Sequence, residues 1–383
     1  MTYKGQRAGV LSEAGADTRF TYDEGWSTTI ACALPAVTRE HFWRGGLIPF
    51  FEHLGPEGWL RGRQARAGGT PDQDDFGLLL NYGADCIGAV GILPPDGTHT
   101  HRLPEADAIE EAATAPGRTL SGVQKKWLVY EDEEGFVPSI RPADPATHIA
   151  KFNRDELPTL VQNEDLSLRL AREILGVDEV TVANRGLVRG ADQIALLVER
   201  FDRKDGERLR LEDFCQILER PRGREFDGKY HSSYEEAAGV VTRHSVRARI
   251  DLDRYFRLVV FNLVIGNADA HLKNFSLLER GDGLRLSPAY DLLNTIVYPQ
   301  YDNLTALEIG GAKRPFDALD RNLLKTLGTD IGLPDKAVDD ALDTLAKRLK
   351  AAKALTLPDR VDAQDFRVAY KNVVADQAAR IFA

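Results

Sequence analysis

A short polar segment between two apolar stretches carries the residues best suited to chemistry. It runs from Ile265 to Phe275, and within it Asp269 and Asn274 stand five positions apart. A carboxylate can accept the proton of an attacking hydroxyl, and an amide oxygen can help to hold Mg²⁺ against phosphates. A further carboxylate, Asp291, lies among apolar residues shortly downstream. The three side chains together indicate phosphoryl transfer.

Each of these residues also has a structural interpretation. The spacing of Asp269 and Asn274 is that of the base and the metal ligand in protein-kinase catalytic loops, but Asp and Asn also gather in ordinary turns. Asp291 could instead cap a helical turn over residues 292–297. Because a kinase needs a metal-binding carboxylate after the hairpin that follows its catalytic loop, the preceding segment favours metal binding for Asp291.

Upstream, Lys151 lies in the strand-like run from His148 to Phe152. An ammonium group that points inward there loses hydration unless it meets a phosphate or a carboxylate. Glu164 could supply that carboxylate from a helix expected over residues 163–175, and Glu173 on the same helix is a rival. The alternative is a solvent-facing lysine on an alternating strand.

Two other segments could bind a nucleotide. The run from Arg118 to Lys126 has one glycine, so it is neither a Walker A loop nor a GxGxxG loop. Its backbone N–H groups, hydroxyls and Lys126 could hold phosphates, although a basic surface turn fits as well. The segment 199–203 could offer backbone groups to adenine and Asp202 to the ribose, unless it is a charged linker.

The elements expected around these residues form a sheet-rich half followed by a helix-rich half. Residues 1–105 have the pattern of a mixed α/β sub-domain, residues 106–200 alternate strand and helix, and residues 201–383 are largely helical. A hairpin is expected around residues 281–283. We therefore predict an α+β fold with two lobes and an N-terminal α/β sub-domain. Helices are expected over residues 251–265, 316–328, 334–353 and 362–381.

Composition restricts the class of protein. The 383 residues are 43% hydrophobic and 28% charged, as in ordinary globular proteins, and the net charge is −10. Such an acidic excess disfavours DNA binding by this chain alone. The N-terminus lacks the apolar stretch of a signal peptide, and no run is long enough to span a bilayer, so a cytoplasmic location is expected. The three cysteines are widely spaced and predict neither a disulfide framework nor a zinc site.

Taken in order, several segments resemble the HipA family of serine/threonine kinase toxins. The N-terminal residues 5–11 and 85–92 also look like that family's N-terminal sub-domain, so the resemblance runs from about residue 3 to about residue 310. It implies a two-lobed, protein-kinase-like fold. The segments are S-G-V-Q-K-K, H-I-A-K-F, L-V-E-R-F-D-R, E-D-F-C-Q, G-N-A-D-A-H-L-K-N-F and S-P-A-Y-D-L-L.

By position, the resemblance implies that Asp269 is the catalytic base, with Lys151 and Asn274 also catalytic. Asn274 and Asp291 would hold Mg²⁺, and Lys151 would contact the α and β phosphates of ATP. The residues implied to bind the nucleotide are Ser121, Gly122, Val123, Lys126, Lys151, Glu199, Phe201, Asp202, His271 and Lys273.

The resemblance also implies self-phosphorylation in the phosphate loop. The family's acceptor is typically a serine three positions before the loop glycine, where this chain has Thr119. The nearest serine is Ser121, so either residue could accept phosphate. Lys125 stands where glutamate is common, which makes the loop more cationic.

The partners implied by the resemblance are a protein substrate, often an aminoacyl-tRNA synthetase, and a small helix-turn-helix antitoxin. DNA would be contacted mainly through the antitoxin, which fits the acidic charge of this chain. Two other functions remain open. One is a kinase-fold binding module that acts mainly as a co-repressor, and the other is a small-molecule phosphotransferase.

Overall fold

The computed structural model describes residues 1–95, 124–140, 144–355 and 363–383. The chain divides into two compact units, each built from two stretches of sequence. The first comprises Met1–Glu156 and Asn184–Gly228, and the second comprises Leu157–Ala183 and Lys229–Ala383. The three sub-domains predicted above divide the chain at other positions and stay a prediction.

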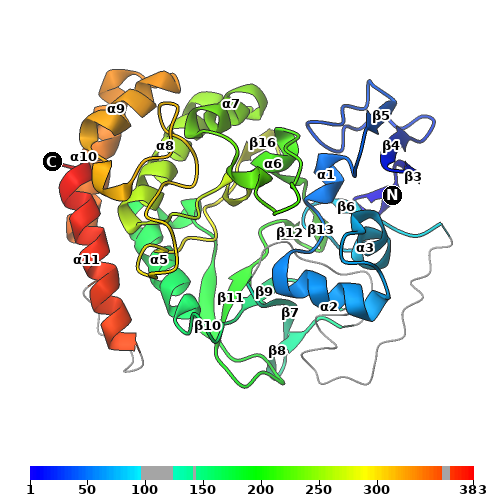
Figure 1. Cartoon of the computed structure of the whole chain (residues 1–383), viewed down its shortest axis with the longest axis horizontal. Coiled ribbons are helices and arrows are strands. Elements are labelled where there is room, and N and C mark those ends of the chain that lie inside the picture. The colour runs from blue at the N-terminus through cyan, green and yellow to red at the C-terminus, as the bar shows by residue number, and fades with distance from the viewer. Residues whose placement is uncertain (96–123, 141–143, 356–362) are drawn as a thin grey trace. The chain divides into compact units, whose positions relative to one another are not determined.

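The N-terminal part of the first unit contains two small antiparallel sheets and three helices (Figure 1). The sheets have the strand orders β2-β1-β6 and β3-β4-β5. Their bounds are β1 (Thr2–Tyr3), β2 (Gln6–Arg7), β3 (Gly9–Ala14), β4 (Asp17–Tyr22), β5 (Glu40–Trp43) and β6 (Val90–Gly91), and the helices are α1 (Pro49–Glu52), α2 (Gly58–Gly68) and α3 (Asp75–Tyr82).

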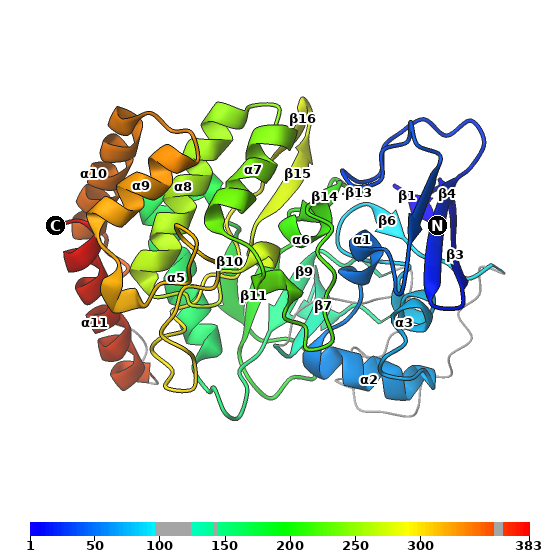
Figure 2. The same cartoon turned by 45° about the horizontal axis from the view of Figure 1, so that its top comes forward.

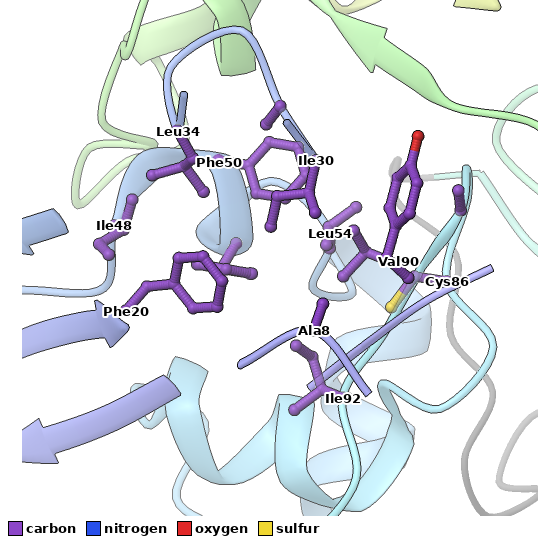
Figure 3. Packing of buried hydrophobic residues seen from close by; sticks show 14 of the residues in the cluster. Ala8, Phe20, Ile30, Leu34, Ile48, Phe50, Leu54, Cys86, Val90 and Ile92 are labelled. Atoms are coloured by element: carbon purple, nitrogen blue, oxygen red, sulfur yellow. The ribbon is translucent and has the colours of Figure 1, made fainter. Parts of the chain in front are cut away.

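Most of these elements share one apolar core, whereas α2 buries Leu60 and Ala65 in two smaller clusters. Alternate residues of β4 point to the same side, so Phe20 and Tyr22 are both buried. The rings of Phe20 and Phe51 pack edge to face with 5.6 Å between their centroids. Figure 3 shows side chains from the strands, from α1 and from the segment that ends at Ile92 converging in this core.

The first unit also contains a five-stranded sheet, in the order β10-β11-β9-β7-β8. Its centre is apolar, with Trp127 packed on Phe152. The strands predicted at 127–130, 148–152 and 194–198 are confirmed. Their bounds are β7 (Lys126–Asp132), β8 (Gly135–Pro138), β9 (His148–Lys151), β10 (Ala183–Gly186) and β11 (Ala195–Glu199).

The helix-rich part begins later than the sequence predicts. After β11 the chain stays in the first unit as far as Gly228. Ion pairs from Arg203 and Arg208 to Asp85 hold this stretch against the N-terminal part of the same unit. Its short elements are β12 (Arg203–Lys204), β13 (Glu207–Arg208), β14 (Leu211–Asp213), α6 (Phe214–Ile217) and the 3-10 turn η2 (Gly228–Tyr230), which ends in the second unit.

The second unit is helical and is arranged around α8, which packs against α7, α10 and α11 (Figures 1 and 2). Twelve residues of α8 are buried, so this helix is a core element, as predicted. The predicted hairpin is confirmed as β15 and β16. The bounds are α5 (Leu160–Ile174), η1 (Val177–Glu179), α7 (Tyr234–His244), α8 (Ala248–Ile265), η3 (Leu272–Asn274), β15 (Ser276–Arg280), β16 (Gly283–Leu286), η4 (Phe316–Ala318), α9 (Arg321–Asp330), α10 (Asp335–Ala351) and α11 (Gln364–Ile381).

The helices and strands together confirm the predicted α+β class. All three cysteines are free thiols. Within the part of the chain that the structure describes, every helix is too short or too polar to cross a membrane.

Candidate active site

The loop that carries Asp269 starts at Gly266, where α8 ends. Gly266 has φ +74°, a left-handed conformation that favours glycine. A Cβ atom here would lie 2.7 Å from Ile296 and 2.8 Å from Val373, so a side chain would not fit. The Gly266 carbonyl accepts hydrogen bonds from the backbone N–H groups of Thr295 (3.0 Å) and Ile296 (3.1 Å). The start of the loop is therefore fixed to the chain that follows Asp291.

Side chains also hold the first residues of the loop. Asn267 donates its amide hydrogen to Oδ1 of Asn262 (2.7 Å) and accepts a hydrogen bond from the N–H of Asp269 (3.1 Å). The N–H of Ala268 donates to Oγ1 of Thr295 (2.6 Å). The backbone that presents Asp269 is thus defined by specific hydrogen bonds.

Asn274 and Asp291 contact each other directly. Nδ2 of Asn274 donates to Oδ2 of Asp291 at 2.9 Å, and Oδ1 of Asn274 accepts from the N–H of His271 at 2.9 Å. The two residues that the sequence assigned to metal binding therefore lie side by side, although seventeen positions separate them.

The backbone at Asp291 is unusual. Its φ is +56°, which is uncommon for a residue other than glycine and is often found at functional sites. Residues 292–297 form no helix, so the alternative that Asp291 caps a helical turn is wrong. The preceding residue, Tyr290, donates its hydroxyl to the carbonyl of Lys273 at 2.8 Å and lies 2.5 Å from Oγ of Ser276. Tyr290 thereby ties the Asp291 segment to the loop.

Asp269 has a partner that the sequence did not reveal. Tyr230 donates its phenolic hydrogen to Oδ1 of Asp269 at 2.5 Å, and Nε2 of His271 lies 3.9 Å from the same oxygen. The Asp269 side chain keeps 37% of its surface exposed, so a substrate can reach it. Because Tyr230 stands 39 positions upstream, no local spacing pattern could have pointed to it.

Lys151 is buried, with 6% of its surface exposed, so the solvent-facing alternative is wrong. It lies on β9 directly opposite Lys126 of β7. Residues directly opposite each other in an antiparallel pair project from the same face, and like charges in that position are destabilising. Such a pair favours an anionic ligand, and both lysines were assigned to phosphate binding.

The two carboxylates considered as partners of Lys151 both lie on α5, in the second unit. Glu173 accepts hydrogen bonds from the backbone N–H groups of Lys353 (2.5 Å) and Ala354 (2.9 Å), so its carboxylate is committed to the end of α10. Glu164 is buried, with 1% of its surface exposed. A pairing of Lys151 with Glu164 stays a prediction.

Asp202 lies in a buried ion cluster. Its carboxylate accepts hydrogen bonds from Arg200, from Arg203 at 2.7 Å and from the N–H of Gly88 at 2.8 Å. Burial raises the pKa of Asp202, but the two arginines more than offset this and lower it. With 2% of its surface exposed, Asp202 has the surroundings of a structural residue. The assigned adenine contacts lie next to it, with Glu199 exposed at the end of β11 and Phe201 half-buried.

The remaining assigned residues fall into two groups. His271 is buried and Lys273 half-buried, and both belong to the loop that carries Asp269. Thr119, Ser121, Gly122 and Val123 lie outside the described residues.

Asp291 and Asn274 have oxygen atoms of the kind that Mg²⁺ binds, but in this structure the Asn274 oxygen faces the N–H of His271 and its amide nitrogen faces Asp291. Carboxylate and amide oxygens are hard ligands, and Mg²⁺ commonly takes one or two of them and completes its shell with phosphate oxygens and water. Over the residues that the structure describes, no three His, Cys, Asp or Glu side chains gather into a metal site. An ion shared with a substrate phosphate needs no such cluster.

The α+β fold and the matches to family models define the class of protein. Residues 1–93 match the HipA N-terminal domain, and residues 118–353 match the HipA-like C-terminal domain. The chain belongs to the HipA family.

Three relatives and one solved structure illustrate the similarity. Y4mE of Sinorhizobium fredii, which carries a kinase name, is 31% identical over 90% of this chain and 88% of its own length. Y4dM of the same organism, also named as a kinase, is 30% identical over 79% of this chain and 75% of its own. The serine/threonine-protein kinase toxin HipA of Shewanella oneidensis is 27% identical over 75% and 71% of the two chains.

The solved structure is the complex of HipA, HipB and operator DNA from Shewanella oneidensis. One of its chains superposes with a TM-score of 0.75 at 23% identity, over 99% of this chain and 97% of that chain. The predicted HipA-like fold is thereby confirmed, and the chain is a homologue of proteins named as kinases.

Proposed function

We propose that the chain is an ATP-dependent serine/threonine protein kinase and the toxin of a toxin–antitoxin pair. The observation that carries the proposal is the contact between Asn274 and Asp291 in the unit that presents Asp269. A base and two oxygen ligands for Mg²⁺ are the minimal set for phosphoryl transfer to a hydroxyl.

In the proposed reaction, Asp269 orients the acceptor hydroxyl and takes its proton as the hydroxyl oxygen attacks the γ-phosphorus of ATP. The bond from that phosphorus to the bridging oxygen breaks, and ADP leaves. Lys126 and Lys151 bind the phosphates, and Asn274 and Asp291 hold Mg²⁺. The ion, when bound, neutralises charge on the phosphate oxygens.

The proposed protein substrate is an aminoacyl-tRNA synthetase, and Thr119 or Ser121 is the proposed site of self-phosphorylation. Both proposals rest on the HipA family to which the chain belongs. The proposed location is the cytoplasm.

A second candidate function is a co-repressor. The fold matches a chain of a complex that contains HipB and operator DNA, which supports a helix-turn-helix antitoxin as partner here. DNA would then be bound mainly by the antitoxin, in keeping with the net charge of −10.

The deciding variant is Asp269→Asn, which keeps the size of the side chain but removes the base. We expect purified wild-type protein with radiolabelled Mg²⁺-ATP to label itself, and Asp269→Asn to lose this labelling by about 10²-fold or more. Chelation of the metal should have the same effect.

Asp282→Asn is the matched control, because Asp282 lies in the β15–β16 turn and pairs only at the surface with Arg247. Equal labelling of wild type and Asp269→Asn refutes the assignment of the base. Phosphoproteomics after brief expression of both forms would identify the substrate. If expression of either form represses an operator equally and no phosphoprotein appears, the co-repressor function is the correct one.

A further inference from the structure

Tyr230 makes two contacts to the loop of Asp269. Its phenol donates to Oδ1 of Asp269 at 2.5 Å, and its ring packs edge to face on the ring of His271 with 5.0 Å between centroids. A hydrogen bond from a phenol to a carboxylate is charge-assisted and is stronger than one between neutral groups. One side chain therefore restrains two residues of the loop.

The Tyr230 ring is itself held in place. The ammonium groups of Lys229 and Lys313 lie 5.3 Å and 5.2 Å from its centroid, within the range of cation–π attraction. Lys313 comes from the segment between the hairpin and α9, far from Tyr230 in sequence. The phenol is thus fixed from several directions, as expected of a group that orients another.

Tyr230 also stands at a defined point of the chain. It ends the turn η2, where the chain passes from the first unit into the second. Gly228 opens this turn, and a Cβ atom there would lie 1.9 Å from the carbonyl oxygen of Pro221, so the turn depends on glycine. Tyr230 is thus the last residue of a turn that requires glycine at its first position.

A base needs a fixed orientation, because proton transfer requires hydrogen-bond reach to the acceptor hydroxyl. The Asp269 side chain is partly exposed, and solvent alone would let it change rotamer. We propose that Tyr230 is a positioning residue, which holds the Asp269 carboxylate in the orientation needed for phosphoryl transfer. This inference rests on the proposed function of Asp269.

Tyr230→Phe tests the proposal, because it removes only the phenolic oxygen and keeps the ring on His271. We expect kcat for phosphoryl transfer to fall roughly 10- to 100-fold, as for a misplaced catalytic group. KM and Kd for ATP should not change, because Tyr230 contacts the base and not a phosphate ligand. A loss of folding would instead lower ATP binding and kcat together. Tyr301→Phe, in the same unit but outside the loop, is the matched control.

A spectroscopic measurement makes the test independent of turnover. In full-length protein labelled with 3-fluorotyrosine, the Tyr230 resonance is the one missing from Tyr230→Phe. We expect Asp269→Asn to shift this resonance more than those of the other ten tyrosines, because the acceptor loses its charge.

The outcomes separate the two proposals. An active wild type with an unchanged kcat in Tyr230→Phe overturns the positioning role and leaves the kinase assignment intact. A wild type that transfers no phosphate overturns the kinase assignment. A Tyr230 resonance that does not respond to Asp269→Asn overturns the contact, and with it the positioning role, whatever the activity.

Discussion

Lys151 and Lys126 place two positive charges opposite each other on neighbouring strands. An anion bound between the two groups would offset their repulsion, and ATP supplies such an anion in the proposed reaction. The proposed phosphate contacts of these two lysines can be tested independently of Asp269.

Replacing Lys151 with methionine removes the charge but keeps most of the side-chain volume. We expect Lys151→Met to raise KM for ATP at least 10-fold, because one phosphate contact is lost, and to fold normally. Steady-state kinetics and ATP titration would measure this. Lys204→Met, at an exposed lysine of β12 in the same unit, is the control. Unchanged ATP affinity in Lys151→Met would remove this lysine from the site.

Asp202 differs from Lys151, because the contacts that the structure shows for it stabilise the fold. Removing one partner from a buried ion cluster typically costs about 3–5 kcal/mol. We expect Asp202→Asn to destabilise the first unit by about 3 kcal/mol without a specific effect on KM for ATP. All four tryptophans lie within residues 1–156, so their fluorescence during urea unfolding reports on this unit. A stable variant with a raised KM would instead establish the ribose contact that the sequence suggested.

Among the elements, α8 contacts the β15–β16 hairpin through hydrogen bonds to Asp251, which is a residue of α8. This carboxylate, which is fully buried, accepts hydrogen bonds from Arg285 (2.8 Å), from the N–H of Leu286 (2.9 Å) and from Ser245 (2.5 Å). Burial raises the pKa of Asp251, but these hydrogen bonds outweigh it and lower the pKa to about 2. Asp251 therefore holds β16, and the chain that leads to Asp291, against α8.

This contact makes the second unit sensitive to acid. The folded pKa of about 2 lies below the value of about 3.9 in an unfolded chain. The stabilisation, about 2–3 kcal/mol, is present above pH 4 and is lost as the pH falls toward 2. In Asp251→Asn we expect lower stability at pH 7 and a smaller further loss between pH 4 and pH 2. Far-UV circular dichroism would follow both units, while tryptophan fluorescence would show the first unit unchanged. A variant as stable as wild type at pH 7 would contradict this role.

The elements could be predicted from the sequence where their pattern is local. The buried helix at 251–265, the strands at 127–130 and 148–152 and the hairpin at 281–283 all follow from periodicity or turn residues, and all are confirmed. Asp269 and Asn274 could be proposed as site residues because both lie in one short segment. Tyr230 was not, because it reaches Asp269 only through the tertiary fold.

The ion cluster around Asp202 also depends on a contact between residues far apart in the sequence. Arg200 and Arg203 lie close by in sequence, but the backbone N–H of Gly88, which completes the cluster, lies 114 positions away. A charged run such as 199–203 resembles a solvated linker when its remote partners are unknown. The burial of Arg200 and Asp202 could therefore not be predicted.

At the scale of the whole molecule, the family and the α+β fold were predictable, because motifs in both halves of the chain contribute to the resemblance. The two lobes were predicted, but the bounds of the two compact units were not. Each is assembled from separated stretches of chain, and hydrophobic periodicity contains no information about which stretches join.

Because the second unit is built from two separate stretches of sequence, its parts are synthesised at different times. Helix α5 is made early, but Ser167 hydrogen-bonds Tyr370 at 2.9 Å, 203 positions later. At translation rates of about 5–20 residues per second, a ribosome needs on the order of 10 to 40 s to cover that distance. During this time the nascent α5 has no native partner on α11, and the helices around α8 are incomplete. The native contact between α5 and α11 can therefore form only after α11 has been made.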